Sequence, residues 1–181
     1  MGSMAGVVEL ADTADLKSAA VRRLGSNPGA GTNYKKEVDV VKCGLMHTDA
    51  SVRGGPKLPR ICGIGVYLRE ARTKEVIVQL SENIEECSSN EAEYLALIRG
   101  LEIALNLGFT HLEVRLDSRL ILQQIQSQRY HVSLQHLSMK VQSLMLQFSS
   151  VHLVHIQRAC NAVADELAFR ATKEAIACPG Y

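Results

Sequence analysis

Four carboxylates stand where expected strands end or expected helices begin: Asp49, Glu93, Asp117 and Asp165. Taken alone, each of them has a structural explanation. Asp49 suits a turn, Glu93 a solvated helix surface, Asp117 a helix cap, and Asp165 the favourable dipole at a helix N-terminus. We expect the strands that carry Asp49 and Asp117 to be neighbours, however, and Glu93 leans toward the same sheet. The carboxylates are therefore expected to gather at one end of the sheet.

Carboxylates held this close together repel one another, and their pKa values rise unless a cation is bound between them. Hard oxygen ligands suit Mg²⁺, with Mn²⁺ as a substitute. Two such ions about 3.5–4 Å apart activate water and stabilise the leaving oxygen of a phosphodiester. The four residues therefore predict a site for two divalent ions and the hydrolysis of a phosphodiester.

The hydrophobic pattern changes its period along the chain, and this change predicts the elements that position the carboxylates. Ser88 and Glu91 form a capping box at the start of a first long helix, and Gly108 ends that helix. Further helices are predicted over residues 118–127, 133–148 and 161–172, the last one capped by Asn161. Alternating and β-branched runs predict strands over residues 38–51, 61–68, 75–80, 112–116 and 151–156.

The predicted order of elements is β-β-β-α-β-α-α-β-α. The short spacing of the first three strands indicates an antiparallel meander, and the later βα units indicate parallel strands. The sequence therefore predicts an α/β fold with a mixed five-stranded sheet and helices on both faces.

The 181 residues suffice for one domain of ordinary size with a tail. Residues 1–40 are predicted to be a flexible N-terminal tail, because most of this segment is rich in Ala, Gly, Ser, Thr and Asp, and residues 1–3 resemble an expression scar. Residues 41–175 are predicted to form the catalytic domain, and residues 176–181 a C-terminal tail.

Composition limits the classes of protein to which the chain can belong. An apolar fraction of 46% and a charged fraction of 22% are typical of a soluble globular protein. Since no run approaches the ~20 apolar residues of a membrane helix, we expect no membrane partner. The net charge of +1 gives no overall basic field for nucleic acid, although a local basic groove would be hidden in the sum. Five cysteines without a CxxC pair favour buried free thiols in a reducing intracellular compartment, the cytoplasm first, with a nucleus or organelle left open.

Four ordered motifs resemble those of the ribonuclease H family, type 1. They are His-Thr-Asp-Ala-Ser at 47–51, Ser-Ser-Asn-Glu-Ala-Glu-Tyr-Leu-Ala-Leu at 88–97, Leu-Asp-Ser at 116–118, and Asn-Ala-Val-Ala-Asp-Glu-Leu-Ala at 161–168. The resemblance implies that Asp49, Glu93, Asp117 and Asp165 are catalytic and bind two Mg²⁺ ions. It also implies an endonuclease that cuts the RNA strand of an RNA/DNA hybrid and leaves a 5′-phosphate and a 3′-hydroxyl.

The same resemblance suggests residues that contact the substrate. Asn90 matches a family position at the sugar edge of the hybrid, where the 2′-hydroxyl distinguishes RNA from DNA; its alternative role is helix capping. Ser118 either contacts substrate or caps the helix that follows. Ser51, Arg53 and Arg158 are further candidates for substrate contacts, Arg53 as part of a phosphate-contacting rim with Lys57 and Arg60.

The sequence also departs from many members of that family. The chain has no Trp, the connection from Gln123 to His131 contains only one basic residue, and the usual loop histidine is missing. This pattern resembles the compact branch that lacks a basic protrusion, with Arg158 as a replacement in the leaving-group or phosphate role. Alternatives are a non-catalytic nucleic-acid-binding module or another nuclease on the same fold. We expect a monomer whose partner is an RNA/DNA hybrid; its protein partners are unknown.

Overall fold

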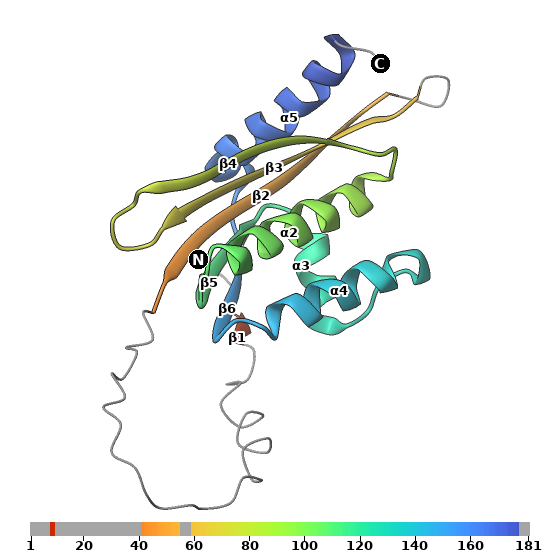
Figure 1. Cartoon of the computed structure of the whole chain (residues 1–181). Coiled ribbons are helices and arrows are strands. Elements are labelled where there is room, and N and C mark those ends of the chain that lie inside the picture. Colours follow the sequence, from red (N-terminus) through yellow and green to blue (C-terminus); the bar gives the residue numbers. More distant parts are fainter. Residues whose placement is uncertain (1–7, 10–40, 55–58, 178–181) are drawn as a thin grey trace, which may run out of the picture.

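The computed structural model describes residues 8–9, 41–54 and 59–177 (Figure 1). Most of the predicted N-terminal tail, residues 178–181 of the predicted C-terminal tail, and Lys57 of the predicted rim lie outside these ranges. The strands and helices, with the labels of Figure 1, are β1 (Val8–Glu9), β2 (Cys43–Arg53), β3 (Ile61–Glu70), β4 (Val76–Ile84), α2 (Ser89–Asn106), β5 (His111–Leu116), α3 (Arg119–Ser127), a 3-10 turn η1 (Val132–Leu134), α4 (Gln135–Met145), β6 (Ser150–His155), a 3-10 turn η2 (Arg158–Asn161) and α5 (Ala162–Ala177).

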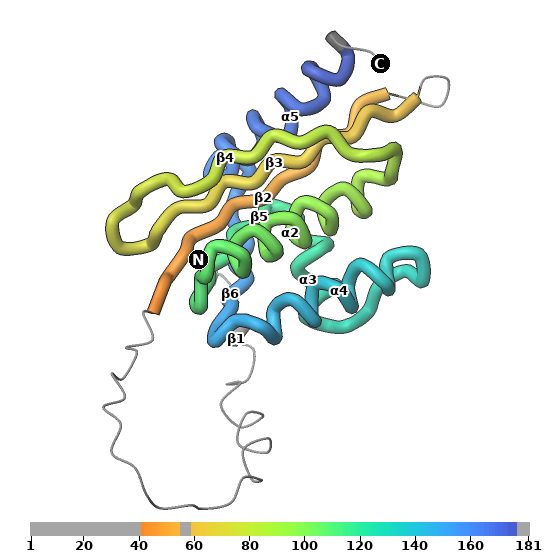
Figure 2. The backbone as a smooth tube through the Cα atoms, in the orientation of Figure 1, coloured from red at the N-terminus to blue at the C-terminus, as the bar shows by residue number. Residues whose placement is uncertain are grey.

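The described strands form one mixed sheet in the order β1-β6-β5-β2-β3-β4. β2, β3 and β4 are antiparallel, whereas β5 is parallel to both β2 and β6. The tube in Figure 2 shows β2 in the middle of the sheet, between β3 and β5. The five predicted strands and their directions are confirmed. The sheet differs in having a sixth strand, because the two residues of β1, in the segment predicted as a tail, pair antiparallel with β6.

Several predicted boundaries need correction. β2 continues beyond Ser51 to Arg53, because β3 supplies backbone partners for its last residues. The predicted helix 133–148 is split into η1 and the shorter α4, and the last helix continues to Ala177. The capping box of Ser88 and Glu91 is confirmed, since Ser88 Oγ accepts from the Glu91 N–H while the Glu91 carboxylate accepts from the Ser88 N–H.

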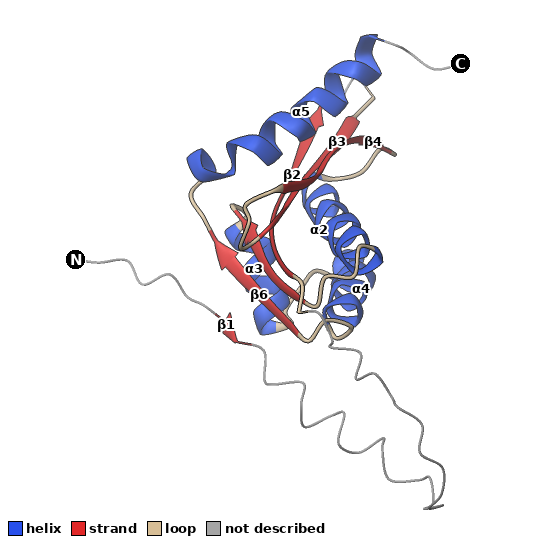
Figure 3. Cartoon of the chain, turned by 60° about the vertical axis from the view of Figure 1, so that its left-hand side comes forward, coloured by secondary structure: helices blue, strands red, loops and turns tan. Residues whose placement is uncertain are grey.

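Helices cover both faces of the sheet, as Figure 3 shows. α2 packs against β2 and β3 on one face, where α3 and α4 pack in turn on α2. α5 crosses β2, β3 and β4 on the other face. The main apolar core lies between the sheet and α2, and its largest fully buried side chains include Tyr94, Phe148 and Met46. None of the helices in the described ranges has the length and hydropathy of a membrane span.

Close contact between α5 and the sheet depends on Gly65 of β3, which lies directly opposite Asp49 in the register of the two strands. A Cβ atom at residue 65 would overlap the Ala164 carbonyl oxygen and lie 2.6 Å from the Ala168 nitrogen. Because both atoms belong to the helix backbone, no side-chain rotation relieves the overlap. The glycine therefore fixes how near α5 comes to β3.

We predict that Gly65→Ala lowers the free energy of unfolding by roughly 1–3 kcal/mol, the usual cost of overpacking a core. Urea denaturation followed by circular dichroism measures the change. Val163→Ala, an exposed position on the same helix, is the control and is expected to change stability by less than about 0.5 kcal/mol. Equal stability of Gly65→Ala and the wild type would show that α5 does not approach β3 this closely.

Candidate active site

Three carboxylates from three elements meet at one end of the sheet. Asp49 lies on β2, Asp117 directly follows β5, and Glu93 lies in the first turns of α2. β2 and β5 are adjacent and parallel, and their last paired residues are His47 and Arg115. Asp49 and Asp117 each follow two residues later, so the two carboxylates come together. One oxygen from each of Asp49, Glu93 and Asp117 lies within 4.8 Å of the others. The sequence-based expectation that these three residues gather is therefore met; we call them the carboxylate cluster.

Burial and mutual repulsion make the carboxylate cluster unfavourable when all of its members are ionised. Burial is the main reason that the pKa of Asp49 is raised to about 7, and the charge of Asp117 adds to it. Burial likewise raises the pKa of Glu93 to about 8, with contributions from Asp49 and Asp117. A divalent cation would reverse this penalty, because it favours the charged form of each ligand. The donor set is made only of hard carboxylate oxygens, and it fits Mg²⁺ or Mn²⁺.

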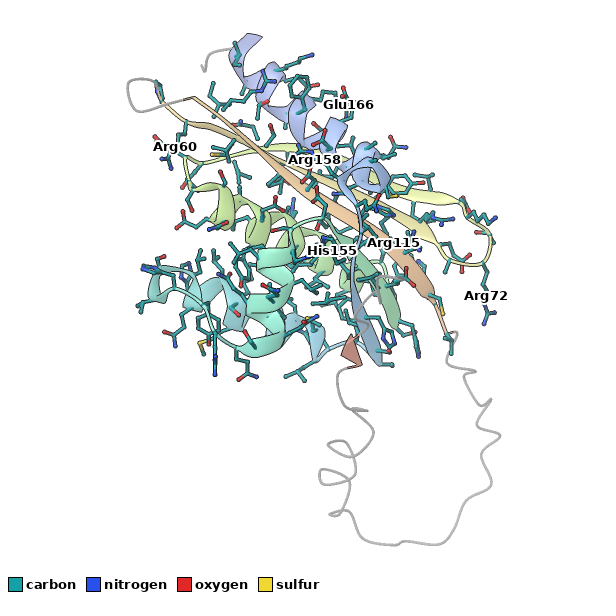
Figure 4. The ribbon with its side chains drawn as sticks, turned by 180° about the vertical axis from the view of Figure 1, so that it is seen from behind. Arg60, Arg72, Arg115, His155, Arg158 and Glu166 are labelled. Carbon is teal, nitrogen blue, oxygen red and sulfur yellow. The ribbon has the colours of Figure 1, made fainter. Side chains whose placement is uncertain are left out.

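Asp165, the fourth predicted carboxylate, lies beside the carboxylate cluster but outside it. It belongs to the first turn of α5, and a hydrogen bond between its side chain and that of Asp49 contributes to the raised pKa of Asp49. Arg158 Nη2 donates to Asp165 Oδ1 at 2.6 Å. Figure 4 shows Arg158 close to the start of α5. Arg158 therefore pairs with the carboxylate that would complete the cluster.

Asn161 is a part of this site that the sequence analysis did not identify. It was predicted to cap the last helix, but its fully buried amide nitrogen donates to Thr48 O at 3.0 Å and to Asp117 Oδ1 at 3.3 Å. The amide thus joins the turn before α5 to β2 and to the carboxylate cluster. A helix-capping role was a sufficient local explanation for Asn161. Its hydrogen-bond partners are 113 and 44 residues away in the sequence, so the neighbouring residues do not indicate them. The only indication in the sequence that Asn161 belongs to the site was its position in the last motif, four residues before Asp165.

Three of the residues predicted to contact the substrate lie within three positions of a member of the carboxylate cluster in the sequence. Asn90 is exposed at the start of α2, three residues before Glu93, and the cap of α2 is Ser88 rather than Asn90. Ser118 follows Asp117 and occupies the N-cap position of α3 without a side-chain capping hydrogen bond. Neither residue therefore has the capping role that was its structural alternative. Ser51 is half-buried on β2, two residues beyond Asp49.

Arg53 lies farther from the carboxylate cluster, at the end of β2. Its guanidinium stacks over the Phe169 ring of α5 at 4.0 Å, and Lys173 lies 4.3 Å from the centre of the same ring. Arg60 is exposed at the start of β3 (Figure 4). The aromatic ring thus holds two cations at the end of the sheet, within the region where the phosphate-contacting rim was predicted.

Comparison with known proteins relates this geometry to a family. The sequence profile of the family described as reverse transcriptase-like matches residues 48–171, which include all four predicted carboxylates. The bifunctional protein Rv2228c of Mycobacterium tuberculosis is 33% identical over 127 residues, 68% of this chain and 34% of that protein. The chain therefore spans about a third of the length of this curated relative. Ribonuclease HI of Halobacterium salinarum is 28% identical over 151 residues, 81% of this chain and 74% of that protein.

Solved structures confirm the predicted fold class. A crystal structure of RNase H1 from Halobacterium salinarum aligns with a TM-score of 0.67 over 73% of this chain and 98% of that chain. LC11-RNase H1, crystallised in complex with an RNA/DNA hybrid, aligns with a TM-score of 0.66 and 32% identity over 74% of this chain and 99% of that chain. The mixed sheet and its helices are therefore those of ribonuclease H structures.

The raised pKa values of Asp49 and Glu93 predict how stability depends on pH when divalent ions are chelated. Both carboxyls bind a proton more tightly in the folded chain than in the unfolded chain. Raising the pH from about 4 to about 8 therefore removes protons that favour folding, and the free energy of unfolding falls. At ~1.4 kcal/mol for each unit of pKa difference, the loss is on the order of a few kcal/mol.

Urea denaturation in EDTA at several pH values measures this dependence. Asp49→Asn is expected to flatten it, because the variant removes one titrating carboxyl and its repulsion of Glu93. Glu86→Gln, at an exposed position, should leave the dependence as in the wild type. A wild-type protein whose stability rises across this pH range would contradict the prediction.

Proposed function

This chain belongs to the ribonuclease H-like family, and from that premise we propose that it is an endoribonuclease that hydrolyses the RNA strand of RNA/DNA hybrids. The observation that carries the proposal is the carboxylate cluster, with Asp165 beside it, just beyond the last paired residues of β2 and β5. A chain that kept the fold only for binding would not need several buried or half-buried acids that repel one another and lower its stability.

Asp49, Glu93, Asp117 and Asp165 are the catalytic residues in this proposal, and they hold two Mg²⁺ ions, for which Mn²⁺ can substitute. When bound, the two ions would activate a water molecule and stabilise the leaving oxygen of the phosphodiester. Asp49 and Asp117 fix the position of the site through two adjacent strands. Glu93 and Asp165 complete it from α2 and α5, on opposite faces of the sheet. The products carry a 5′-phosphate and a 3′-hydroxyl.

Substrate contacts in this proposal come from residues around the cluster. Asn90, exposed three residues before Glu93, recognises the 2′-hydroxyl edge of the RNA strand. Ser51, near Asp49, and Ser118, next to Asp117, contact the sugar-phosphate backbone of the hybrid. Arg53, farther along β2, contacts another phosphate of the hybrid. Arg158, whose side chain is 78% exposed, leaves Asp165 to contact the leaving group or a phosphate.

We predict that the protein in Mg²⁺ or Mn²⁺ cuts only the RNA strand of a labelled RNA/DNA hybrid, and that Asp117→Asn reduces cutting to the limit of detection. The variant loses a carboxylate ligand while keeping a side chain of the same shape. Gel electrophoresis of the hybrid, with duplex RNA and duplex DNA as controls, measures the activity. End analysis of the fragments checks for the 5′-phosphate.

Arg129→Gln, an exposed position beyond α3, is the matched variant and is expected to cut the hybrid like the wild type. Binding of the hybrid without cutting in either metal, by a folded wild-type protein, would favour a non-catalytic binding module. Cutting of duplex DNA would favour another nuclease of the same fold.

We also predict that Mg²⁺ raises the melting temperature of the wild-type protein at neutral pH. Ions that bind only the folded chain stabilise it by mass action, about 2.7 kcal/mol at a hundred times the dissociation constant. Differential scanning fluorimetry across a Mg²⁺ titration measures the shift in melting temperature. The melting temperature in EDTA, which chelates divalent ions, is the reference. Asp49→Asn should show a smaller shift than Glu86→Gln, and equal shifts in both variants would contradict binding at this site.

A further inference from the structure

His47 lies on β2, two residues before Asp49, and it is not a member of the carboxylate cluster. Its ring Nδ1 is 3.3 Å from Asn161 Oδ1. Asn161 is the residue whose amide nitrogen bonds to Thr48 O and to Asp117 Oδ1. A single buried amide therefore connects His47 to one of the proposed metal ligands.

The direction of these hydrogen bonds follows from their chemistry. Thr48 O and the Asp117 carboxylate oxygen can only accept, so the Asn161 amide must turn its NH₂ group toward both of them. Its Oδ1 must then face His47, and because Oδ1 carries no proton, His47 Nδ1 has to be the donor. The Nδ1–H of His47 thereby completes the hydrogen bonding of a fully buried amide.

The His47 ring is itself held in place by its neighbours on the sheet. Tyr67 lies directly opposite on β3, and the two rings meet edge to face with centroids 5.9 Å apart. On the other side His47 is paired with Arg115 of β5. The contact with Tyr67 and the hydrogen bond to Asn161 restrain the ring, so it can help to define the position of the amide.

We propose that His47 is a positioning residue of the metal site, which acts through Asn161 to hold the Asp117 carboxylate in place. The hydrogen bonds from His47 to Asn161 and from Asn161 to Asp117 also connect three elements of the site. These are β2, which carries Asp49, the turn before α5, which leads to Asp165, and the end of β5, which leads to Asp117. The inference rests on the proposed function, because it concerns the geometry of the same metal site.

Binding of Mn²⁺ alone to the full chain, measured by isothermal titration calorimetry, tests the role of His47 without relying on cleavage. His47→Phe keeps an aromatic ring against Tyr67 but removes the donor. It is expected to weaken Mn²⁺ binding by about tenfold, the lower end of the effect of losing a residue that supports a metal ligand. His152→Phe, a histidine on β6 whose ring bonds to Ser150, is the control and should bind Mn²⁺ like the wild type.

A double-mutant cycle tests whether His47 acts through Asn161. Asn161→Ala should weaken Mn²⁺ binding, and adding His47→Phe to it should cause no further loss. If the two substitutions weaken Mn²⁺ binding independently, so that their effects multiply in the double variant, His47 does not act through Asn161. Unchanged Mn²⁺ affinity of a folded His47→Phe would overturn the inference as a whole.

His47→Asn and His47→Leu provide a second pair in case His47→Phe does not fold. The two side chains have similar size, but only Asn offers an N–H near the place of Nδ1. Tighter Mn²⁺ binding by the Asn variant than by the Leu variant would support the donor role, and equal binding would overturn it. A wild-type protein that binds no Mn²⁺ would instead contradict the proposed metal site, so the two failures are distinguishable.

Discussion

The repulsion among Asp49, Glu93 and Asp117 is the interaction on which the rest of the structure depends. Burial raises the pKa of Asp49 to about 7 and that of Glu93 to about 8, so ionising these carboxyls near neutral pH without a bound cation costs stability. A chain can keep such a cluster only if the surrounding elements prevent the carboxylates from moving apart. Two adjacent parallel strands, with a helix on each face, provide this constraint. Backbone pairing of β2 with β3 fixes the position of Asp49, and pairing of β2 with β5 fixes the strand end before Asp117.

Neutral and positive groups around the cluster compensate for part of that repulsion. Asn161 donates to Asp117 without adding charge, and Arg158 pairs with Asp165. The two groups differ in how firmly they are held. Asn161 is fully buried, whereas the Arg158 side chain is 78% exposed and its pair with Asp165 is open to water. The buried amide is therefore suited to permanent support of Asp117, whereas the exposed ion pair of Arg158 and Asp165 contributes little to stability.

The sequence alone was sufficient for the fold class and for the core of the site. Period-two runs predicted five strands, and the short spacing of the first three together with the later βα units predicted their directions. The capping box at Ser88 and Glu91 predicted the start of α2. Glu91 serves that capping box, whereas Glu93, two residues later, belongs to the carboxylate cluster. Boundaries were less accurate at the end of β2 and in α4, because β3 extends β2 by pairing and a 3-10 turn takes up the start of the helix predicted from Ser133.

The residue types, their order and their local periodicity thus determined which elements form and which carboxylates converge. Only the tertiary structure decided how those carboxylates are supported. Asn161 was interpreted as a helix cap, and His47 as one residue of a strand motif, because each has an adequate local role. Their hydrogen bond joins positions 114 residues apart, and it exists only because β2 and the turn before α5 meet at the end of the sheet. Local patterns report on neighbours within a few residues, whereas contacts of this kind are set by packing.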